Sequence, residues 1–371
     1  MIGYIRLQAA QNAMPVAPEA FPFREWTGRP SRRTRSDFRL KGNTMNRNRS
    51  LDFIKGFLII FVIITHFGWS DSERSAYCFP FWIDIAVPVF MIISGYAASL
   101  SMVKNKVASL EEAYPGKLVA GKLLRYTIPF MIAFAIDLSY RAWVEKAEIR
   151  LAPTIQLFLQ GGNGPGSYYY PIMLQFVFVF PVIFFLVKRK AKKGLLICFL
   201  ANAAFEVFKW AYLMNSEYYR LLIFRYLFPI AFGCYLALYP GTIKKREYLI
   251  SFVVGSGFLI LTEYAGYTPR IVYWWSKTSF LAVLYAIPIF ALVFLRLAPH
   301  WGPVELLGKA SYNIFLTQMV YYRYGTRYVY PHISNRILQL TANVVICLAV
   351  GVVFYLIENP LTRKLKKRIG A

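Results

Sequence analysis

The sequence predicts an all-α, polytopic integral membrane protein, because apolar residues dominate its composition and recur in long runs. Of the 371 residues, 57% are hydrophobic and only 16% are charged, whereas about a quarter of the residues in a soluble domain are charged. The apolar runs have the length, about 20 residues, that a tilted helix needs to cross the hydrocarbon layer of a bilayer. This composition argues against a soluble globular domain.

Ten such runs give ten predicted spans. A window of about 19 residues places them at residues 50–69, 79–102, 124–143, 168–187, 194–213, 219–239, 248–264, 278–295, 306–322 and 337–357. An even number of spans puts both termini on the same side of the membrane.

The distribution of positive charge predicts which side that is. The formal net charge is +25, which could indicate a nucleic-acid partner, but Lys and Arg lie mostly between the spans. They concentrate in the connections on the side of the termini, including KRKAKK at 188–193 and RKLKKR at 363–368. Positive charge marks the cytoplasmic face. We therefore expect both termini in the cytoplasm, a bacterial cytoplasmic membrane around the spans, and no bound nucleic acid.

Residues 1–44 form no span and precede a predicted membrane domain at 45–371. They are rich in Arg and Pro and lack the continuous apolar core of a secretory signal. Three interpretations stay open: a disordered basic cytoplasmic tail, a stretch upstream of a true start at Met45, or a targeting peptide.

The cysteines give no sign of a cross-linked or metal-bound fold. Cys78, Cys198, Cys234 and Cys347 occur singly, without CxxC spacing or nearby histidines. The pattern predicts neither a disulfide framework nor a metal site.

The first span, SLDFIKGFLIIFVIITHFGW, carries ionisable residues inside an apolar run. Lys55 and His66 are eleven positions apart, about three helical turns, so they lie on one helix face roughly 16 Å apart along the axis. An ionisable side chain within a span indicates a functional site, because its desolvation is costly. We expect this helix to hold a cation near its cytoplasmic end and a base near its outer end.

His66 is the candidate general base. The other histidines, His300 and His332, fall in connections between spans. Unperturbed imidazole has a pKa of about 6.5, so at neutral pH much of it can accept a proton from a hydroxyl group. The alternative interpretation is a structural histidine whose nitrogens are satisfied by neighbours.

The third span opens with two basic residues on one helical face. Lys122 and Arg125 are three positions apart at the cytoplasmic border. They either anchor the helix at the membrane surface or join Lys55 in a basic mouth for a phosphate-rich ligand, since Lys and Arg are the usual partners of phosphate.

Other polar residues could line the same site. In the second span, Ser94 and Gly95 would let another backbone approach closely, and Pro88 is expected to kink the helix. The connection GGNGPGSYYYP at 161–171 suggests a backbone that wraps something closely. Its Ser167 and Tyr168 could line a polar or sugar-bearing site, or the tyrosines could belong to an interfacial aromatic belt.

Later spans add a second group of candidates. Arg225 and Glu206 lie in neighbouring predicted spans, and they either pair with each other or line a cavity. In the ninth span a polar stripe is formed by Gly308, Ser311, Tyr312 and Gln318. The role of Glu358, at the end of the last span, stays open.

Taken in order, these motifs resemble the integral membrane acyltransferase family often called acyltransferase type 3, over about residues 49–360. LDFIKGFLIIFVIITH is similar to the family's LDxxRG segment with its following histidine, VPVFMIISGY to FFxxSG, and KLLRYTIP to RxxRxxxP. RYLFPIAFG is similar to a later Arg and Gly motif, GKASYNIFLTQ to GxxSYxxYLxH, and IENP to IExP.

The sequence departs from the family pattern at several positions. Lys replaces the commoner Arg at 55 and 122, which keeps the charge but loses the guanidinium fork. Phe315 and Gln318 stand where many members have Tyr and His, which puts a second histidine there in doubt. No SGNH-type esterase domain follows, so we expect a stand-alone member whose transfer finishes in the membrane domain or passes to another protein.

The resemblance implies an O-acyltransferase that uses cytoplasmic acyl-CoA, foremost acetyl-CoA, and a hydroxyl acceptor on a cell-surface polysaccharide or lipid-linked glycan. His66 would then be the base, and Lys55, Lys122 and Arg125 would hold the phosphates of the donor. Weaker candidates for lining the tunnel or holding the acceptor are Ser94, Ser167, Tyr168, Arg225, Ser311, Tyr312 and Gln318. The rival interpretation is a transporter or flippase for an anionic or glycan-linked substrate, in which the intramembrane charges mark a translocation path. Inverted repeats would favour it, and we find none in the sequence.

Overall fold

The structure of the chain is a computed structural model that describes residues 44–272, 275–297 and 299–370. Residues 45–371 form one compact unit. The predicted basic tail lies outside the described residues, except for its last position. Throughout the described ranges every regular element is a helix and none is a strand, in agreement with the predicted all-α class.

The elements follow one another as α1 (Thr44–Thr65), α2 (Asp71–Ala76), α3 (Phe79–Trp82), α4 (Ala86–Lys104), α5 (Leu110–Ala113), α6 (Gly116–Trp143), α7 (Leu151–Leu159), α8 (Tyr169–Ala211), α9 (Ser216–Leu221), η1 (Ile223–Tyr226), α10 (Leu227–Leu238), α11 (Lys245–Glu263), η2 (Arg270–Val272), η3 (Ser276–Thr278), α12 (Phe280–Pro288), η4 (Ile289–Phe294), α13 (Leu295–Leu297), α14 (Gly302–Lys309), α15 (Ser311–Val320), η5 (Tyr321–Gly325), α16 (Thr326–Val329), η6 (Tyr330–His332) and α17 (Arg336–Arg368).

Several of these helices are apolar enough to span a membrane. Among the described residues, four helical stretches have both the length and the hydropathy for it: Phe79–Lys104, Leu110–Trp143, Tyr169–Ala211 and Arg336–Arg368. Two shorter apolar stretches, Ile223–Leu238 and Phe280–Phe294, accompany them. Each predicted span overlaps a helix, and the count of ten crossings stays a prediction.

The longest element contains two predicted spans. α8 covers both 168–187 and 194–213, and its two halves meet at Ala191, whose backbone angles (φ 39°, ψ −118°) are not helical. Gly194 lies directly against the preceding half, because a Cβ there would be 2.7 Å from the carbonyl oxygen of Leu186. The basic run 188–193 therefore forms the corner between the two halves.

Several predicted spans are broken rather than continuous. The stretch 278–295 begins as α12, reaches Pro288 and continues as the wider π-helical turn η4. Proline has no backbone N–H and disturbs the regular hydrogen-bond ladder, and π turns often mark functional regions. The stretch 306–322 is divided into α14 and α15 at Ala310.

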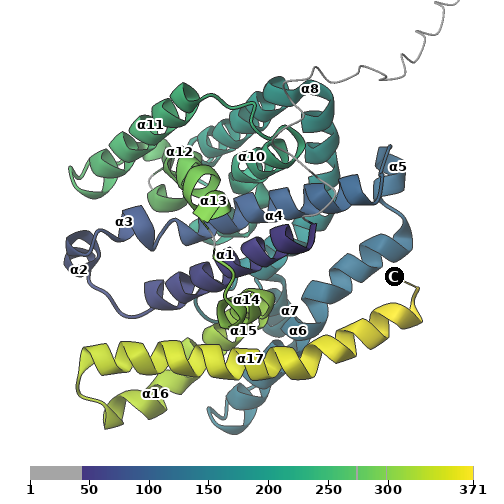
Figure 1. Cartoon of the computed structure of the whole chain (residues 1–371). Coiled ribbons are helices and arrows are strands. Elements are labelled where there is room, and N and C mark those ends of the chain that lie inside the picture. The colour runs from purple at the N-terminus through teal and green to yellow at the C-terminus, as the bar shows by residue number, and fades with distance from the viewer. Residues whose placement is uncertain (1–43, 273–274, 298, 371) are drawn as a thin grey trace, which may run out of the picture. The chain divides into compact units, whose positions relative to one another are not determined.

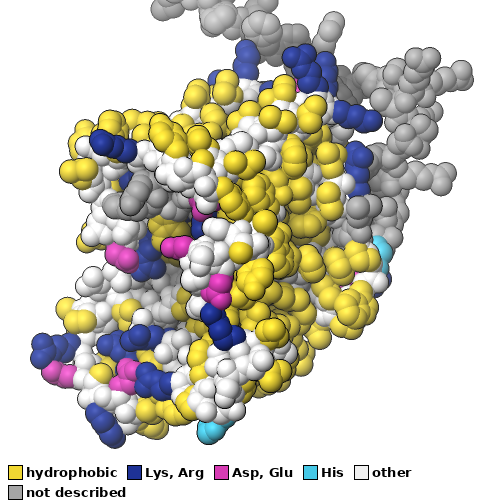
Figure 2. All heavy atoms as spheres, turned by 90° about the vertical axis from the view of Figure 1, so that its left-hand side faces the viewer, with side chains coloured by type: hydrophobic (Ala, Val, Ile, Leu, Met, Phe, Trp, Pro, Cys, Tyr) yellow, Lys and Arg dark blue, Asp and Glu magenta, His cyan; other side chains and the backbone are white. Residues whose placement is uncertain are grey.

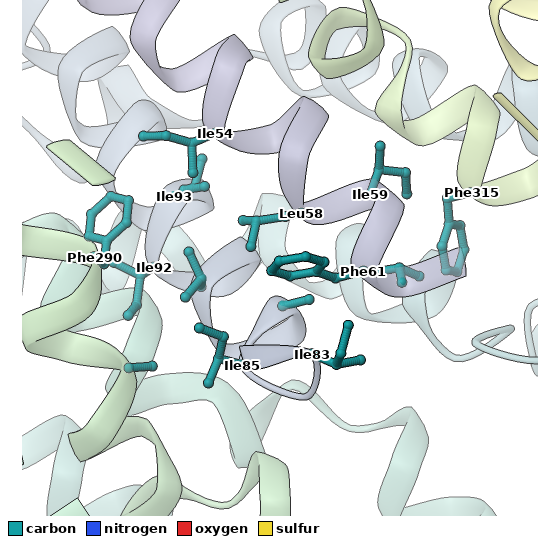
Figure 3. Packing of buried hydrophobic residues seen from close by; sticks show 14 of the residues in the cluster. Ile54, Leu58, Ile59, Phe61, Ile83, Ile85, Ile92, Ile93, Phe290 and Phe315 are labelled. Atoms are coloured by element: carbon teal, nitrogen blue, oxygen red, sulfur yellow. The ribbon is translucent and has the colours of Figure 1, made fainter. Parts of the chain in front are cut away.

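Helix α1 lies at the centre of the packing. Its Ile54 and Leu58 face Ile92 and Ile93 of α4 and Phe290 of η4 in one buried hydrophobic cluster (Figure 3). Burying such side chains contributes roughly 1.5–3 kcal/mol each relative to exposure. The active-site helix expected from the sequence is therefore enclosed by its neighbours.

Glycines let helices touch along their backbones. A Cβ on Gly95 of α4 would lie 2.0 Å from the carbonyl oxygen of Ile230, and one on Gly233 of α10 would lie 1.9 Å from that of Ile92. This is the close approach that the small residues of the second span predicted. In the same way, a Cβ on Gly308 of α14 would lie 1.7 Å from the carbonyl oxygen of Asp52, which brings the start of α1 against α14.

The unit has two distinguishable ends. The start of α1 and the end of α17 lie at one end, with α5, whereas α2, α3 and α16 lie at the other (Figure 1). The placement of both termini on one side of the membrane, and the identity of that side, stay predictions. Viewed from the α2 end, basic and acidic side chains lie together around a hollow, and hydrophobic side chains cover much of the adjacent flank (Figure 2).

Candidate functional site

Two cavities share a wall inside the unit. The larger, about 740 Å³, contains His66 and is lined by segments that include α2, α9 and the connection 161–168. The smaller, about 590 Å³, contains Lys55, Lys122 and Arg125. The residues that line both cavities are Phe90, Tyr169, Ser311 and Tyr312. A single layer of side chains therefore separates the predicted base from the predicted basic mouth.

The smaller cavity carries an excess of positive charge. Lys55 Nζ pairs at 2.6 Å with Oδ1 of Asp52, which lies one turn earlier on α1. The positive charge of Lys55 therefore already has a partner. Lys122 and Arg125 of α6 line the cavity, and no carboxylate of the described residues pairs with either. The structure thus brings the three predicted cations together, with two of them free to meet an anion.

Lys309 is a cation that the sequence analysis did not select. It lines the same cavity at the end of α14, where the close contact at Gly308 holds it beside α1. Its place next to the polar stripe, near the start of the ninth predicted span, was the available signal. The lining of this cavity also includes apolar side chains, among them Met102, Met173 and Phe176.

His66 follows directly after the end of α1 and lines the larger cavity. A Cβ on Gly166 would lie 3.7 Å from His66 Nε2 and 2.8 Å from Phe315 Cε2. Tyr322 packs edge-on against the imidazole, with ring centroids 6.3 Å apart. Within the described part of the chain, no hydrogen bond engages either imidazole nitrogen. The ring is therefore confined by its neighbours, while its nitrogens can meet a ligand.

An ion pair beside His66 was missed by the sequence analysis. Arg74 Nη2 donates to Asp84 Oδ1 at 2.7 Å, and Thr65 Oγ1 donates to the same oxygen at 3.1 Å. Arg74 Nη1 also donates to the carbonyl oxygen of Thr65 at 3.3 Å, which places the guanidinium next to His66. Asp84 within the apolar run 79–102 was the signal, because an acid inside a predicted span is costly without a partner.

Local capping positions Arg74. Ser70 accepts a hydrogen bond from the backbone N–H of Glu73, and the Glu73 carboxylate accepts one from the backbone N–H of Ser70, which together fix the start of α2. Arg336 Nη1 pairs with Glu73 Oε1 at 2.8 Å. The hydrogen bonds from Ser70 and the charge of Arg336 hold the pKa of Glu73 below its usual range, so it stays a carboxylate at neutral pH.

The glycine-rich connection wraps closely around α15, as its composition predicted. A Cβ on Gly164 would lie 2.6 Å from the carbonyl oxygen of Met319. Gln318 is fully buried and reaches the carbonyl oxygen of Pro165 at 3.5 Å, so it lies behind the connection rather than on a cavity wall. Ser167 is also buried and accepts a hydrogen bond from Arg220 Nη1 at 2.9 Å.

The other predicted lining residues divide between the two cavities. Tyr168 lines the larger cavity only, and Ser94 the smaller one only. Ser311 and Tyr312 belong to the shared wall, where the Tyr312 hydroxyl donates to the carbonyl oxygen of Tyr126 at 3.0 Å. Ser94 donates to the carbonyl oxygen of Phe90 at 2.8 Å.

Arg225 follows neither of the alternatives predicted for it. It is 1% exposed and hydrogen-bonds Thr278 Oγ1 at 2.7 Å, and it does not line either cavity among the described residues. Glu206 instead pairs with Lys209 at 2.9 Å and accepts a hydrogen bond from the Tyr219 hydroxyl at 2.6 Å. Arg225 thus contacts residues that line the larger cavity, such as Thr278, without lining it itself.

Glu358 has a structural partner on another helix. It accepts a hydrogen bond from Asn313 Nδ2 at 3.1 Å and another from the Thr362 hydroxyl. It therefore ties α17 to α15. Among the described residues no group of three His, Cys, Asp or Glu side chains is placed to hold a metal ion.

Comparison with known proteins gives one match. A family model described as acyltransferase domain matches residues 48–356, a range that contains every residue lining the two cavities. No curated protein and no solved structure matches the chain.

Proposed function

Because the chain belongs to the acyltransferase family that its motifs resemble, acyltransferase type 3, and is therefore a membrane acyltransferase, we propose a specific transfer reaction for it. The chain would transfer an acyl group, specifically acetyl, from cytoplasmic acetyl-CoA to a hydroxyl of an extracytoplasmic glycan. The observation that carries this proposal is the pair of cavities, one cationic and one holding His66, separated by a single layer of side chains. In the proposed orientation the cationic cavity opens to the cytoplasm of a bacterial cell.

The cationic cavity fits the donor. Coenzyme A carries several phosphate groups, and charge-assisted hydrogen bonds from Lys and Arg are strong phosphate contacts. Lys122, Arg125 and Lys309 would hold these phosphates, with Lys55 ordered beside them by Asp52. The extended pantetheine arm would bring the thioester to the shared wall.

His66 would act on the acceptor from the other side of that wall. Its neutral imidazole takes the proton of the acceptor hydroxyl as the oxygen attacks the thioester carbonyl. The tetrahedral intermediate then collapses, the carbon–sulfur bond breaks, and the thiolate of coenzyme A receives the proton from the imidazolium. No group other than donor and acceptor is consumed.

Arg74 would stabilise the negative charge that develops on the carbonyl oxygen. Fixed cations and hydrogen-bond donors aimed at such charge commonly give the largest electrostatic contribution to acyl transfer. Asp84 holds the guanidinium at 2.7 Å, so Arg74 does not need to reorganise during the reaction.

The acceptor would be a cell-surface polysaccharide or a lipid-linked glycan. The His66 cavity, about 740 Å³, is large enough for sugar residues and is lined by Trp275, Tyr168 and Phe315 together with polar groups. Ligand sites typically combine such an aromatic lining with a few placed polar groups.

The first experiment expresses the protein in a bacterial host lacking its own copy and measures ester-linked acetyl on surface glycans. His66→Ala should lower acetylation roughly 10²- to 10⁴-fold, as expected when a general base is removed. His332→Ala, at an exposed histidine, is the matched control and should acetylate like the parent at equal membrane abundance. Equal acetylation by His66→Ala would remove His66 as the base. Movement of an unmodified glycan or anion across the membrane would favour the transporter.

A further inference from the structure

A short aromatic segment forms one wall of the His66 cavity. Trp275, Ser276, Lys277 and Thr278 all line the cavity, and the last three form the single turn η3. Trp275 precedes that turn and is 40% exposed. The first three residues of the segment lie between the predicted spans 248–264 and 278–295, and Thr278 is the first residue of the second of these spans.

Side chains from other elements hold the polar residues of this segment. Ser276 Oγ donates to Glu263 Oε1 at 2.7 Å, and Lys277 Nζ pairs with Glu263 Oε2 at 3.1 Å. Thr278 Oγ1 accepts from Arg225 Nη2 at 2.7 Å. One carboxylate at the end of α11 and one buried guanidinium thus fix the turn.

Trp275 is held from behind while part of its surface stays open. The Arg225 guanidinium lies over its indole ring, 5.1 Å from the centroid, and Tyr168 packs edge-on with ring centroids 5.8 Å apart. Its backbone is left-handed, with φ 64°, a conformation that non-glycine residues keep only where their surroundings enforce it. The exposed part of the ring is therefore fixed before any ligand arrives.

Arg225 is buried among aromatic rings and makes few hydrogen bonds there. It is 1% exposed, and its Nε and Nη1 atoms have no hydrogen-bond partner. Its guanidinium instead lies against Tyr219 and Tyr226, at 4.7 and 4.8 Å from the ring centroids, as well as Trp275. Stacking of a weakly hydrated guanidinium on aromatic faces is favourable, and here it makes the tryptophan rigid.

The charges that line the cavity are balanced. Arg74 pairs with Asp84 at 2.7 Å, and Arg220 with Glu217 at 2.7 Å. Lys277 is neutralised by Glu263, as described above. Each of these cations already has a carboxylate partner. The lining of the His66 cavity therefore offers no unpaired positive charge that would attract an acidic ligand.

We propose that Trp275 is a stacking platform for an uncharged sugar ring of the acceptor, and that Arg225 is the positioning residue behind it. This inference rests on the glycan acceptor of the proposed function. Stacking on the rigid indole would orient the ring so that one hydroxyl meets His66, while the balanced charges of the wall disfavour acidic sugars.

The test uses membranes containing the full chain, with acetyl-CoA and the surface glycan that the parent acetylates in the host. We expect Trp275→Leu to raise the apparent KM for glycan roughly tenfold or more, because the substitution removes the aromatic face on which the sugar ring would stack. The KM for acetyl-CoA should not change, which also reports an intact fold. Trp275→Phe should retain most of the affinity, and Trp301→Leu, an exposed tryptophan elsewhere, should match the parent.

The positioning role of Arg225 is tested by asking whether the effect of its substitution on the glycan KM requires Trp275. Arg225→Lys should raise the glycan KM, whereas the double variant Arg225→Lys/Trp275→Leu should be no worse than Trp275→Leu, because the two residues act as a unit. A merely structural arginine would instead add its own loss, and would shift the KM for acetyl-CoA as well.

The outcomes separate this inference from the function on which it rests. A parent that acetylates no glycan overturns the glycan acceptor and this inference together. A parent that acetylates glycan while Trp275→Leu keeps a normal glycan KM overturns the platform alone. A parent that acetylates acidic sugar residues in preference to neutral ones overturns the assignment to uncharged rings.

Discussion

Gly166 shows how little space surrounds the imidazole. Its φ of +84° is left-handed, and a Cβ there would lie 2.8 Å from Phe315 and 3.7 Å from His66. A left-handed backbone costs an L-residue roughly 1–2 kcal/mol, and the crowding would be added to that cost. The glycine therefore permits both the path of the connection and the close packing around His66.

We expect Gly166→Ala to lower glycan acetylation at least about tenfold, because a shift of about 1 Å in a reacting group can cost as much as 10² in rate. The measurement is ester-linked acetyl in the host at matched membrane abundance. Gly68→Ala is the control, since nothing lies within 4 Å of a Cβ at that position. Activity of Gly166→Ala equal to that of the control would contradict the tight packing around His66.

Arg74 offers a second prediction at a single residue. Arg74→Gln should reduce the acetylation rate by about 10²- to 10³-fold, the cost of losing one fixed donor to a developing oxyanion, and Asp84→Asn should reduce it less. The KM for acetyl-CoA should change little. Arg150→Gln, at an exposed arginine paired with Glu148, serves as the control. A full rate in Arg74→Gln would show that the guanidinium only braces α2.

The sequence indicated which residues belong to the candidate site more clearly than it indicated which of them contact each other. The ionisable residues Lys55 and His66 stood out because a span tolerates few of them. The pair of Arg74 and Asp84 did not, because their contact depends on how α2 and α3 fold back beside the end of α1. Likewise, nothing in the sequence indicates that Arg225 reaches Thr278, 53 positions later, rather than Glu206.

At the scale of elements, hydropathy predicted where helices lie but not where they break. The apolar runs overlap helices throughout the described residues, since apolar length is enough to require a helix in a membrane. The non-helical backbone at Ala191 and the π turns η4 and η5 leave no equally clear mark. Their positions depend on packing against neighbouring helices.

The contact between α1 and α14 leads to a prediction about the smaller, cationic cavity. Gly308→Ala would place a Cβ 1.7 Å from the Asp52 carbonyl oxygen. The two helices must therefore separate, which moves Lys55 away from Lys309. We expect a lower thermal midpoint and a higher KM for acetyl-CoA. Gly302→Ala, in the same helix with nothing within 4 Å, should behave like the parent. An unchanged KM in Gly308→Ala would show that the helix contact does not shape the cavity.

Helix α6 supplies two of the cations that line the smaller cavity, Lys122 and Arg125. Their contribution can be measured by comparing donors with and without phosphates. Arg125→Gln should raise the KM for acetyl-CoA by roughly ten- to a hundredfold, since hydrogen bonds to charged groups contribute about 1.5–3 kcal/mol. With acetyl-pantetheine, which lacks the phosphates, the variant and the parent should react alike. Lys117→Gln, an exposed position of the same helix, is the control. An equal defect with both donors would mean that Arg125 does not bind phosphate.

At the scale of the whole molecule, the two ends of the unit should differ in how cysteines placed there react with a labelling reagent. Cys78 is exposed near α2, whereas the other cysteines are buried. A membrane-impermeant maleimide added to intact cells should label the parent but not Cys78→Ser. A cysteine introduced by Lys364→Cys in the Cys78→Ser background, near the end of α17, should react only after the cells are opened. The reverse pattern would invert the orientation and place the cationic cavity outside.

The single layer of side chains shared by the two cavities has an electrical consequence. If water fills both cavities, the potential across the bilayer falls mainly over this layer rather than over the full hydrocarbon thickness. One elementary charge gains or loses about 2.3 kcal/mol per 100 mV, so the wall would hold a steep electric field. Any charge that shifts across it during turnover would make the rate depend on voltage, although no ion is carried through. The measurement is the acetyl-transfer rate in proteoliposomes clamped at opposite membrane potentials. Equal rates at the two potentials would indicate that the field is spread across the whole protein.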